Sequence, residues 1–251
     1  MTRIDRIYRY PVKGLSAEPL GAVTLTAGDG LPLDRTFALA RAGAAFDPAH
    51  PVWLAKRNFL MLMRDERLAE LAVTYDDASA RLRIRHDGRQ VLEADTDSDA
   101  GREAIEGFFE HFMGSMGRPR LVRAPGHMFT DNPTPYVSLI NLATVREIAR
   151  TLGRESLDPL RFRANLYVDD LEPWAELDWV GRELAAGLVR LACAERIDRC
   201  AATNVDPTTA ARDLNIPLAL RQAYGHIDCG VLLGVNRGGR LEPGQAIGPA
   251  G

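Results

Sequence analysis

Cys200 is the residue of this sequence whose type and position best suit it for chemistry. It stands in the segment Ile197-Asp198-Arg199-Cys200-Ala201, where an apolar run passes into a polar turn. A cysteine at the end of a strand is accessible, and the adjacent arginine favours the thiolate, which is the reactive and metal-binding form. Thiolate is also a soft ligand of the kind that heavy transition metals prefer. The alternative is a small apolar side chain that only fills space in the core.

The other candidate nucleophiles and ligands have weaker contexts. Cys193 follows the alternation of a strand and Cys229 stands at the entry to one, so both are expected to pack in the core. Three cysteines without a Cys-x-x-Cys pair indicate neither a disulfide framework nor a four-cysteine metal site. His226 follows a glycine and suits either the wall of a site or a hydrogen bond that fixes its loop. His226 and Asp228 are candidate proton donors near the mouth of a site.

Several basic residues stand at expected turns rather than on helix faces. They are Lys13, Arg35, the pair Lys56-Arg57, and Arg163. Loops at the rim of a barrel are where ligand groups collect. Basic side chains that converge there clamp a phosphate or another anion, and arginine does so through a bidentate fork. Taken singly, each of these residues could instead be solvated or paired with a neighbouring carboxylate.

Most of the elements that must position these residues are expected to be short strands. Residues 4–10, 22–26 and 36–40 alternate or are apolar and β-branched. Residues 81–85 and 90–93 predict a hairpin, because Asp87-Gly88 supplies the positive φ angles of a tight turn. Later strands are expected over residues 163–168, 188–194 and 230–235, with residues 236–239 as the turn of a final hairpin.

Two segments have the periodicity of helices. In residues 98–114, apolar side chains form one stripe after a cap at Ser98 or Asp99, and a second helix is expected from Asn141 to Gly153. Residues 123–135 are rich in proline and glycine and indicate a connection. We therefore expect a mostly β fold with a few helices, of the β-barrel or α+β class. It would comprise an N-terminal β-barrel domain over residues 1–125 and a second β-barrel domain over residues 126–251.

The composition excludes several classes of function. The chain has 251 residues with 31 basic and 34 acidic side chains, so its net charge of -3 argues against a nucleic-acid-binding protein. Any anion site must therefore be local. No run approaches the roughly 18 apolar residues of a membrane span, and the first residues are too charged for a signal peptide. We expect no membrane partner and a cytoplasmic location. Phosphate-loop, zinc-protease and serine-nucleophile motifs are absent.

Two groups of segments, in consistent order, together resemble a known family. Residues 10–14 (Tyr-Pro-Val-Lys-Gly) and 33–35 (Leu-Asp-Arg) resemble the N-terminal β-barrel domain that accompanies MOSC domains. The second half resembles the MOSC domain itself, named after the C-terminal domain of molybdenum-cofactor sulfurase. The matching elements are Arg161-Phe162-Arg163-Ala164-Asn165, Pro173-Trp174-Ala175-Glu176 with Trp179, Arg199-Cys200, Asn204-Val205-Asp206-Pro207, and Gly230-Val231 with the final hairpin.

The resemblance implies a cofactor and a set of residues that hold it. In the amidoxime-reducing proteins of mitochondria and their bacterial counterparts, the cysteine matching Cys200 ligates molybdenum. The residues matching Lys13, Arg35, Arg163 and Asn165 hold the pterin and its phosphate. To these we add Arg199, beside the cysteine, and Arg57, in a segment that roughly resembles the family's Thr-x-Arg stretch.

Two positions depart from the family pattern. Gly14 stands where the reductases commonly have serine, which puts one hydrogen bond to the cofactor in doubt. Asp198 stands where they have a small polar residue. A carboxylate near an anionic cofactor is unfavourable unless Arg199 or Arg163 neutralises it.

The resemblance implies an oxidoreductase that reduces N-hydroxylated or N-oxide compounds at molybdenum. The substrate would be a small molecule whose oxygen leaves as water after a two-electron reduction. Electrons would come from a separate electron-transfer protein, because no ferredoxin-like cysteine cluster follows the second half. The alternative is a non-catalytic carrier that holds the molybdenum cofactor or carries sulfur as a Cys200 persulfide. A pyridoxal-phosphate site around Lys13 suits the local cations but lacks the matching pattern of lysine and carboxylate.

Overall fold

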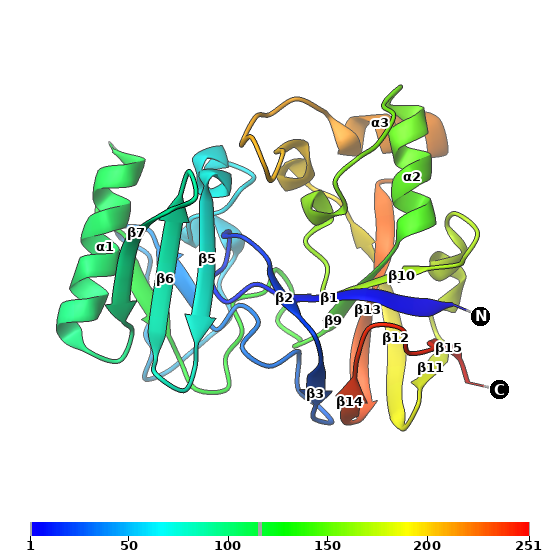
Figure 1. Ribbon diagram of the computed structural model, residues 1–251, viewed down its shortest axis with the longest axis horizontal. Helices are drawn as coiled ribbons and strands as arrows, with labels where there is room; N and C mark the ends of the chain where they lie inside the picture. The colour runs from blue at the N-terminus through cyan, green and yellow to red at the C-terminus, as the bar shows by residue number, and fades with distance from the viewer. Residues whose placement is uncertain (1, 115–116, 251) are drawn as a thin grey trace.

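The computed structural model describes residues 2–114 and 117–250, which form mostly β-strands with three α-helices, as expected. The largest sheet has eight strands and contains segments from both ends of the chain (Figure 1). Their order across the sheet is β15 (Gly248–Pro249), β11 (Glu183–Ala186), β12 (Val189–Asp198), β13 (Asp228–Arg237), β9 (Val137–Asn141), β10 (Leu166–Asp169), β1 (Arg3–Arg9) and β2 (Glu18–Leu20).

This sheet is so strongly curled that β1 meets the segment before β15. The amide of Ile4 donates to the carbonyl oxygen of Gln245 at 2.9 Å, and the amide of Gly244 donates to the carbonyl oxygen of Ile4 at 2.7 Å. Alternate side chains of the strands point inward, where Leu139 of β9 and Leu191 of β12 are fully buried in one apolar core. The sheet is therefore a barrel-like shell around its own core.

Two helices pack on the sheet in a second apolar cluster. These are α2 (Leu142–Thr151) and α3 (Ile216–Tyr224), and their buried residues Val145 and Leu220 share a cluster with Tyr167 of β10. The side chain of Asn141 caps α2 by accepting a hydrogen bond from the amide of Ala143. The helix expected from Asn141 to Gly153 is confirmed.

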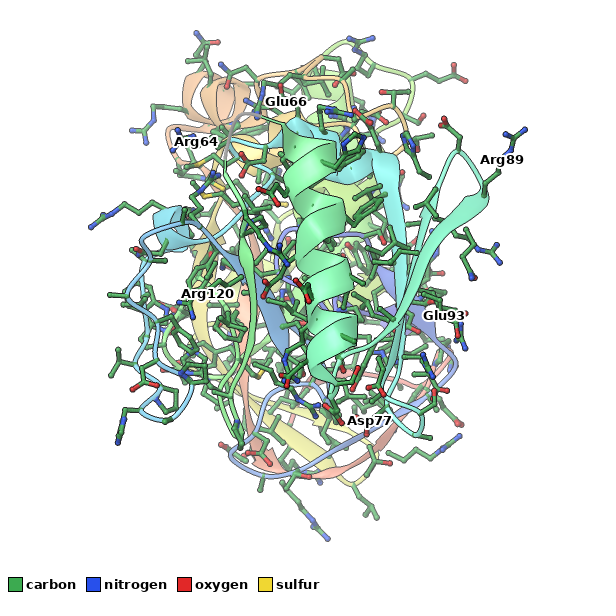
Figure 2. The ribbon with its side chains drawn as sticks, turned by 90° about the vertical axis from the view of Figure 1, so that its left-hand side faces the viewer. Arg64, Glu66, Asp77, Arg89, Glu93 and Arg120 are labelled. Carbon is green, nitrogen blue, oxygen red and sulfur yellow. The ribbon has the colours of Figure 1, made fainter. Side chains whose placement is uncertain are left out.

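A second, smaller body holds most of the first half of the chain. The strands β5 (Leu71–Asp76), β6 (Arg81–His86) and β7 (Arg89–Asp95) form one sheet, and β4 (Phe37–Ala40) pairs with β8 (Arg120–Arg123). The helix α1 (Asp99–Met113) is capped by Ser98 and shares an apolar cluster with the sheet through Ile105 and Phe109. Figure 2 shows α1 in front of this body, with charged side chains such as Arg89 and Glu93 pointing outward.

The early hairpin is confirmed, and its turn has the expected positive φ angles at Asp87 and Gly88. The strand predicted over residues 163–168 starts only at Leu166. Arg163 is in the left-handed conformation, with φ 54°, at the end of the 3-10 helix η3 (Pro159–Phe162). A residue in that conformation interrupts an extended strand.

The predicted final hairpin is wrong. After β13 the chain enters β14 (Gly239–Leu241), which pairs with β3 (Val23–Leu25) instead of returning along β13. Val23, Leu25 and Leu241 are buried in the core of the large sheet, and this burial decides the pairing. A Cβ on Gly238 would lie 2.3 Å from the carbonyl oxygen of Leu25, so this close approach requires glycine.

The first strands of the chain thus belong in space to the sheet of the second half. The remaining short helices are the 3-10 segments η1 (Lys56–Asn58), η2 (Glu66–Glu70), η4 (Ala175–Trp179) and η5 (Ala201–Asn204). No helix among the described residues is long and apolar enough to cross a membrane.

Candidate functional site

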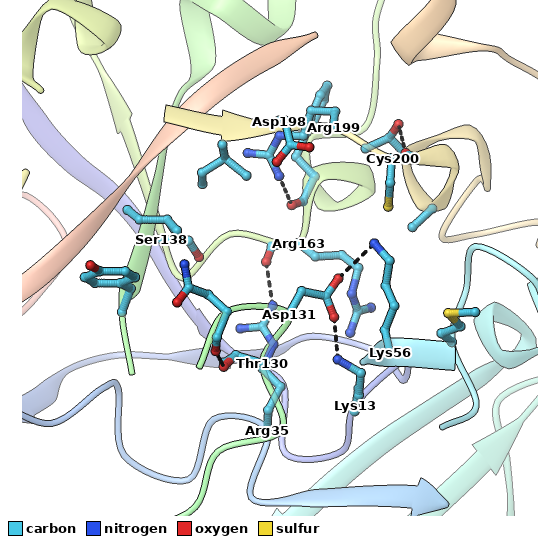
Figure 3. A pocket seen from close by; sticks show the side chains of 18 of the residues that line it. Lys13, Arg35, Lys56, Thr130, Asp131, Ser138, Arg163, Asp198, Arg199 and Cys200 are labelled. Carbon is cyan, nitrogen blue, oxygen red and sulfur yellow. Dashed lines mark hydrogen bonds and ion pairs between the residues drawn. The ribbon is translucent and has the colours of Figure 1, made fainter. Parts of the chain in front are cut away.

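A cavity of about 530 Å³ brings together residues from both halves of the chain. Lys13, Arg35 and Lys56 come from the first half, and Arg163 and Cys200 come from the second (Figure 3). Its size lies within the range of cofactor and small-molecule sites, which is roughly 300–1,000 Å³.

Cys200 lines this cavity at the end of a strand, as the sequence indicates. Strand β12 ends at Asp198, and Cys200 precedes the 3-10 helix η5. Its carbonyl oxygen accepts hydrogen bonds from the amide and the hydroxyl of Thr203, which fixes the backbone while the side chain stays partly exposed. By contrast, Cys193 and Cys229 are buried in the core, and burial raises their pKa to about 11 and about 12. Cys200 is therefore the thiol that is open to the cavity.

Two lysines and one carboxylate form a chain of ion pairs in the cavity. The Nζ of Lys13 lies 2.5 Å from Oδ1 of Asp131 and donates to the carbonyl oxygen of Phe129 at 2.9 Å. The Nζ of Lys56 lies 3.2 Å from Oδ2 of the same carboxylate. Burial alone would raise the pKa of Asp131, but the two ammonium groups outweigh it and hold the pKa at about 2. The carboxylate is therefore ionised between its two lysines.

Lys56 also reaches the thiol. Burial lowers the pKa of its ammonium group, but Asp131 and the side chain of Cys200 together raise it above the ordinary value. Figure 3 shows the Lys56 amine and the Cys200 sulfur facing the same space. Lys56 is therefore a cation that faces the Cys200 sulfur across the cavity.

Two arginines stack on the ring of Tyr10 at the same cavity. The guanidinium carbons of Arg35 and Arg163 lie 4.5 and 4.4 Å from the ring centroid. Arg35 is ion-paired with the buried carboxylate of Asp34, which also accepts a hydrogen bond from the amide of Tyr10. The guanidinium of Arg163 has no hydrogen bond or ion pair with any residue that the structure describes. Burial and the charge of Arg35 lower the pKa of Arg163 to about 10.

Two other predicted residues line the cavity but use their side chains to hold the backbone. Arg199 donates to the carbonyl oxygens of Phe162 and Cys229, at 2.9 and 2.7 Å. Asn165 accepts from the amide and the hydroxyl of Ser138 and donates to the carbonyl oxygen of Tyr8. These contacts position the ends of β10 and β12 and leave little of either side chain for a ligand.

The structure places Lys56, and not the predicted Arg57, in the cavity. Arg57 is exposed and does not line the cavity, whereas Lys56 does. Both lie in the 3-10 helix η1, where consecutive side chains point about 120° apart, so only one of the two faces inward. The sequence shows the basic pair but does not show which member turns toward the site.

The remaining expected residues lie at the mouth or outside the cavity. Asp198 lines it but is exposed, with no ion pair to Arg199 or Arg163 among the described contacts. His226 and Asp228 do not line it: the ring of His226 packs on Trp174 and Tyr224, and its Nδ1 accepts from the amide of Asp228. The hydrogen-bond role expected for His226 is thus observed, and neither residue is placed to donate a proton in the cavity.

The structure also explains the glycine at position 14. It has φ +83°, and a Cβ there would lie 3.0 Å from the carbonyl oxygen of Leu60. A serine would be strained at this position, so the chain has no hydroxyl there.

Taken together, cations outnumber carboxylates around the cavity. Its lining includes the cations Lys13, Arg35, Lys56 and Arg163 and the carboxylate of Asp131, while Asp34, the buried ion-pair partner of Arg35, does not line it. This leaves a surplus of positive charge in a chain whose net charge is -3. Such local convergence of cations beside a soft thiol suits a ligand that carries both a metal and a phosphate.

Comparison with known proteins places the second half of the chain in a family. Residues 127–248 match the model of the MOSC domain. Over 133 residues, the chain is 31% identical to the molybdenum cofactor sulfurase of Caenorhabditis briggsae, and this match covers 51% of the chain but only 18% of that protein. The chain therefore corresponds to a small part of that relative.

Two solved structures show more distant similarity. The YUAD protein from Bacillus subtilis has 15% sequence identity and a TM-score of 0.46, with 98% of this chain and 94% of that chain covered. YiiM from Escherichia coli has 17% identity and a TM-score of 0.35, with 46% of this chain and 54% of that chain covered.

Proposed function

Residues 127–248 of this chain are a MOSC domain, and from that premise we propose that the protein holds a molybdenum cofactor in the cavity described above. The Cys200 thiolate would be a ligand of the metal. One observation carries this proposal: the accessible thiol opens on the same cavity as four converging cations. A phosphate-bearing cofactor of a soft-ligand metal needs both features in one place.

The residues present fit such a group. Arg163 offers a whole guanidinium fork, because its guanidinium stacks on the Tyr10 ring but has no hydrogen bond or ion pair with any described residue, and arginine forks bind phosphate oxygens in pairs. Lys13 has a further donor beyond its contacts with Phe129 and Asp131.

Each residue of the cavity then has a definite task. Arg163, Arg35 and Lys13 would bind the phosphate, and Lys56 would hold a proton on its Nζ beside the sulfur. Arg199 fixes the chain just before Cys200, because its guanidinium donates to the carbonyl oxygens of Phe162 in η3 and of Cys229 in β13. When bound, the cofactor would supply the two-electron chemistry, while the protein supplies the ligand, the orientation and the enclosure.

We propose a reductase of N-hydroxylated or N-oxide compounds that takes electrons from a separate protein. The arrangement of Cys200 and its cations, together with the resemblance of both halves to the amidoxime-reducing proteins, supports this proposal. The substrate would enter at the side of Asp198, which is exposed at the cavity mouth.

A carrier function is the second candidate, and the similarity to a molybdenum cofactor sulfurase favours it. A thiolate beside a lysine is equally suited to hold a persulfide. The protein would then deliver cofactor or sulfur to another enzyme and would catalyse no reduction.

A turnover assay separates the two candidates. Protein from a cofactor-producing host is supplied with a reduced viologen dye and an amidoxime, and formation of the amidine is followed. A reductase gives turnover that Cys200→Ala abolishes and Cys193→Ala, at a buried thiol, retains. Full cofactor loading without turnover, with labelled sulfur recovered on Cys200, would establish the carrier and refute the reductase.

A further inference from the structure

We propose that Asp131 competes with the phosphate group of a ligand for Lys13 and Lys56, and so sets how much negative charge a ligand must carry to bind. This inference rests on the proposed function of the cavity. It concerns a residue in the loop between Arg123 and Val137 that no sequence pattern singles out.

The carboxylate of Asp131 contacts the lysines in the way an anionic ligand would. One oxygen faces Lys13 and the other faces Lys56, at 2.5 and 3.2 Å. Two oxygens of a phosphate group accept hydrogen bonds from two ammonium groups in the same manner. The carboxylate and the phosphate would therefore compete for the same two donors.

Asp131 is also the member of the trio that is free to leave. Its side chain is 55% exposed, whereas those of Lys13 and Lys56 are 9% and 31% exposed. It lies in a segment without helix or strand, and Lys13 keeps the carbonyl oxygen of Phe129 as a partner. Displacement would therefore turn the carboxylate toward water and leave the lysines in place.

The carboxylate of Asp34, which is paired with Arg35 beside the cavity, behaves differently. Asp34 is 1% exposed, is paired with Arg35 and accepts the amide of Tyr10 at 2.7 Å. Breaking that buried arrangement is costly, so Asp34 stays. Of the two carboxylates, only Asp131 has both the partners and the exposure for exchange.

A selectivity follows from this exchange. A monoanion brings the lysines no more charge than Asp131 already supplies, whereas a dianion such as a phosphate monoester brings more. Asp131 thus disfavours small monoanions and admits dianions. Without its charge, the site would bind anions more tightly and with less discrimination.

The test is a calorimetric titration of the full chain with inorganic phosphate at pH 8 and low salt. Removing the charge of Asp131 frees two donors from partly exposed ion pairs, each of modest strength. We therefore expect Asp131→Asn to tighten phosphate binding about tenfold, which corresponds to about 1.4 kcal/mol. The matched control is Asp198→Asn, which removes another exposed carboxylate of the same cavity, one without a lysine partner. It should change the affinity by less than about threefold.

Two further measurements test whether the effect of Asp131→Asn comes from competition for the lysines. On a Lys13→Met background, the gain from Asp131→Asn should shrink, because one of the two competed donors is gone. The indole N–H of Trp53 donates to the carbonyl oxygen of Thr130 at 3.3 Å, so its fluorescence reports movement of the Asp131 loop. Phosphate should change that emission in the wild type, and Trp53→Phe should remove the change.

The outcomes separate this inference from the proposed function. If phosphate binds, Lys13→Met weakens it, and Asp131→Asn leaves it equal or weaker, then Asp131 orients the lysines for the ligand and competition is refuted. If phosphate does not bind even to Asp131→Asn, the anion site itself is refuted, together with the inference that rests on it.

Discussion

Arg163 and Arg35 lie over the same Tyr10 ring, yet replacing each by methionine should change the stability of the protein in opposite directions. Arg163 has no acidic partner among the described residues, and its pKa is lowered from 12.5 to about 10 by burial and by Arg35. The folded state therefore disfavours the charged form of Arg163 at every pH below about 10. Arg35, by contrast, neutralises the carboxylate of Asp34, which is 1% exposed.

The magnitudes follow from these surroundings. The lowering of the Arg163 pKa from 12.5 to about 10, at about 1.36 kcal/mol per pH unit, sets an upper limit of about 3.4 kcal/mol for the cost of the Arg163 charge. Water in the open cavity screens part of that cost, so we expect Arg163→Met to stabilise the protein by about 1–2 kcal/mol. Arg35→Met leaves a buried carboxylate without its cation and should destabilise by about 3–5 kcal/mol.

The assay is urea unfolding of protein from a host that lacks the cofactor, with thermal unfolding beside it. For a chain of this length, 1 kcal/mol shifts Tm by about 2–4 °C. The gain from Arg163→Met should be constant between pH 6 and 9, because it is fully present below pH 10, and it should shrink above pH 10 as the wild-type side chain loses its proton. The same variant should lose most of its phosphate affinity. A destabilised Arg163→Met, or a harmless Arg35→Met, would refute this account of the two cations.

Three further predictions concern single residues. Lys56→Met should lower the molybdenum content of protein from a cofactor-producing host, and Arg57→Met should leave it unchanged, because Lys56 lines the cavity and Arg57 does not. Metal analysis of the two purified variants tests this prediction. Burial raises the pKa of the Glu176 carboxyl group, so the free energy of unfolding of the wild type should fall as the pH rises from about 4.5 through that pKa. Glu176→Gln lacks the titrating group, so its denaturation should show no such fall. Gly230→Ala should destabilise by several kcal/mol in urea unfolding, since its Cβ would lie 2.4 Å from the carbonyl oxygen of Leu139 at φ +83°. An unfolding midpoint equal to that of the wild type would contradict this close approach of β13 to β9.

Local signals in the sequence were sufficient for much of the fold. The hairpin at Asp87-Gly88 and the helices capped by Ser98 and Asn141 depend on turn and cap chemistry between neighbours, and they form as predicted. The partner of β14 does not depend on neighbours. It is decided by burial of Leu241 against strands that come more than two hundred residues earlier in the chain. No local pattern contains that information.

Some residues of the candidate site were also predictable from the sequence, and others were not. Strand-end position and family resemblance identified Cys200, Lys13, Arg35 and Arg163, which the structure brings to one cavity. The pair Lys56-Arg57 was recognised, but Arg57 was chosen as the cofactor-binding member, because the sequence does not show which side chain of a single 3-10 turn faces the cavity. Asp131 was missed because its loop has no periodicity, and its partners lie more than seventy residues away.

The measurement that tests the central claim most directly is the molybdenum-to-protein ratio of the wild type beside Cys200→Ala and Cys193→Ala, all purified from the same cofactor-producing host. Cys200 opens on the cavity and Cys193 is buried in the core, so the two variants separate ligation from any general loss of a thiol. The account predicts near-stoichiometric molybdenum in the wild type and in Cys193→Ala, and little in Cys200→Ala. Absence of molybdenum from the wild type, or equal loading of all three proteins, would contradict it.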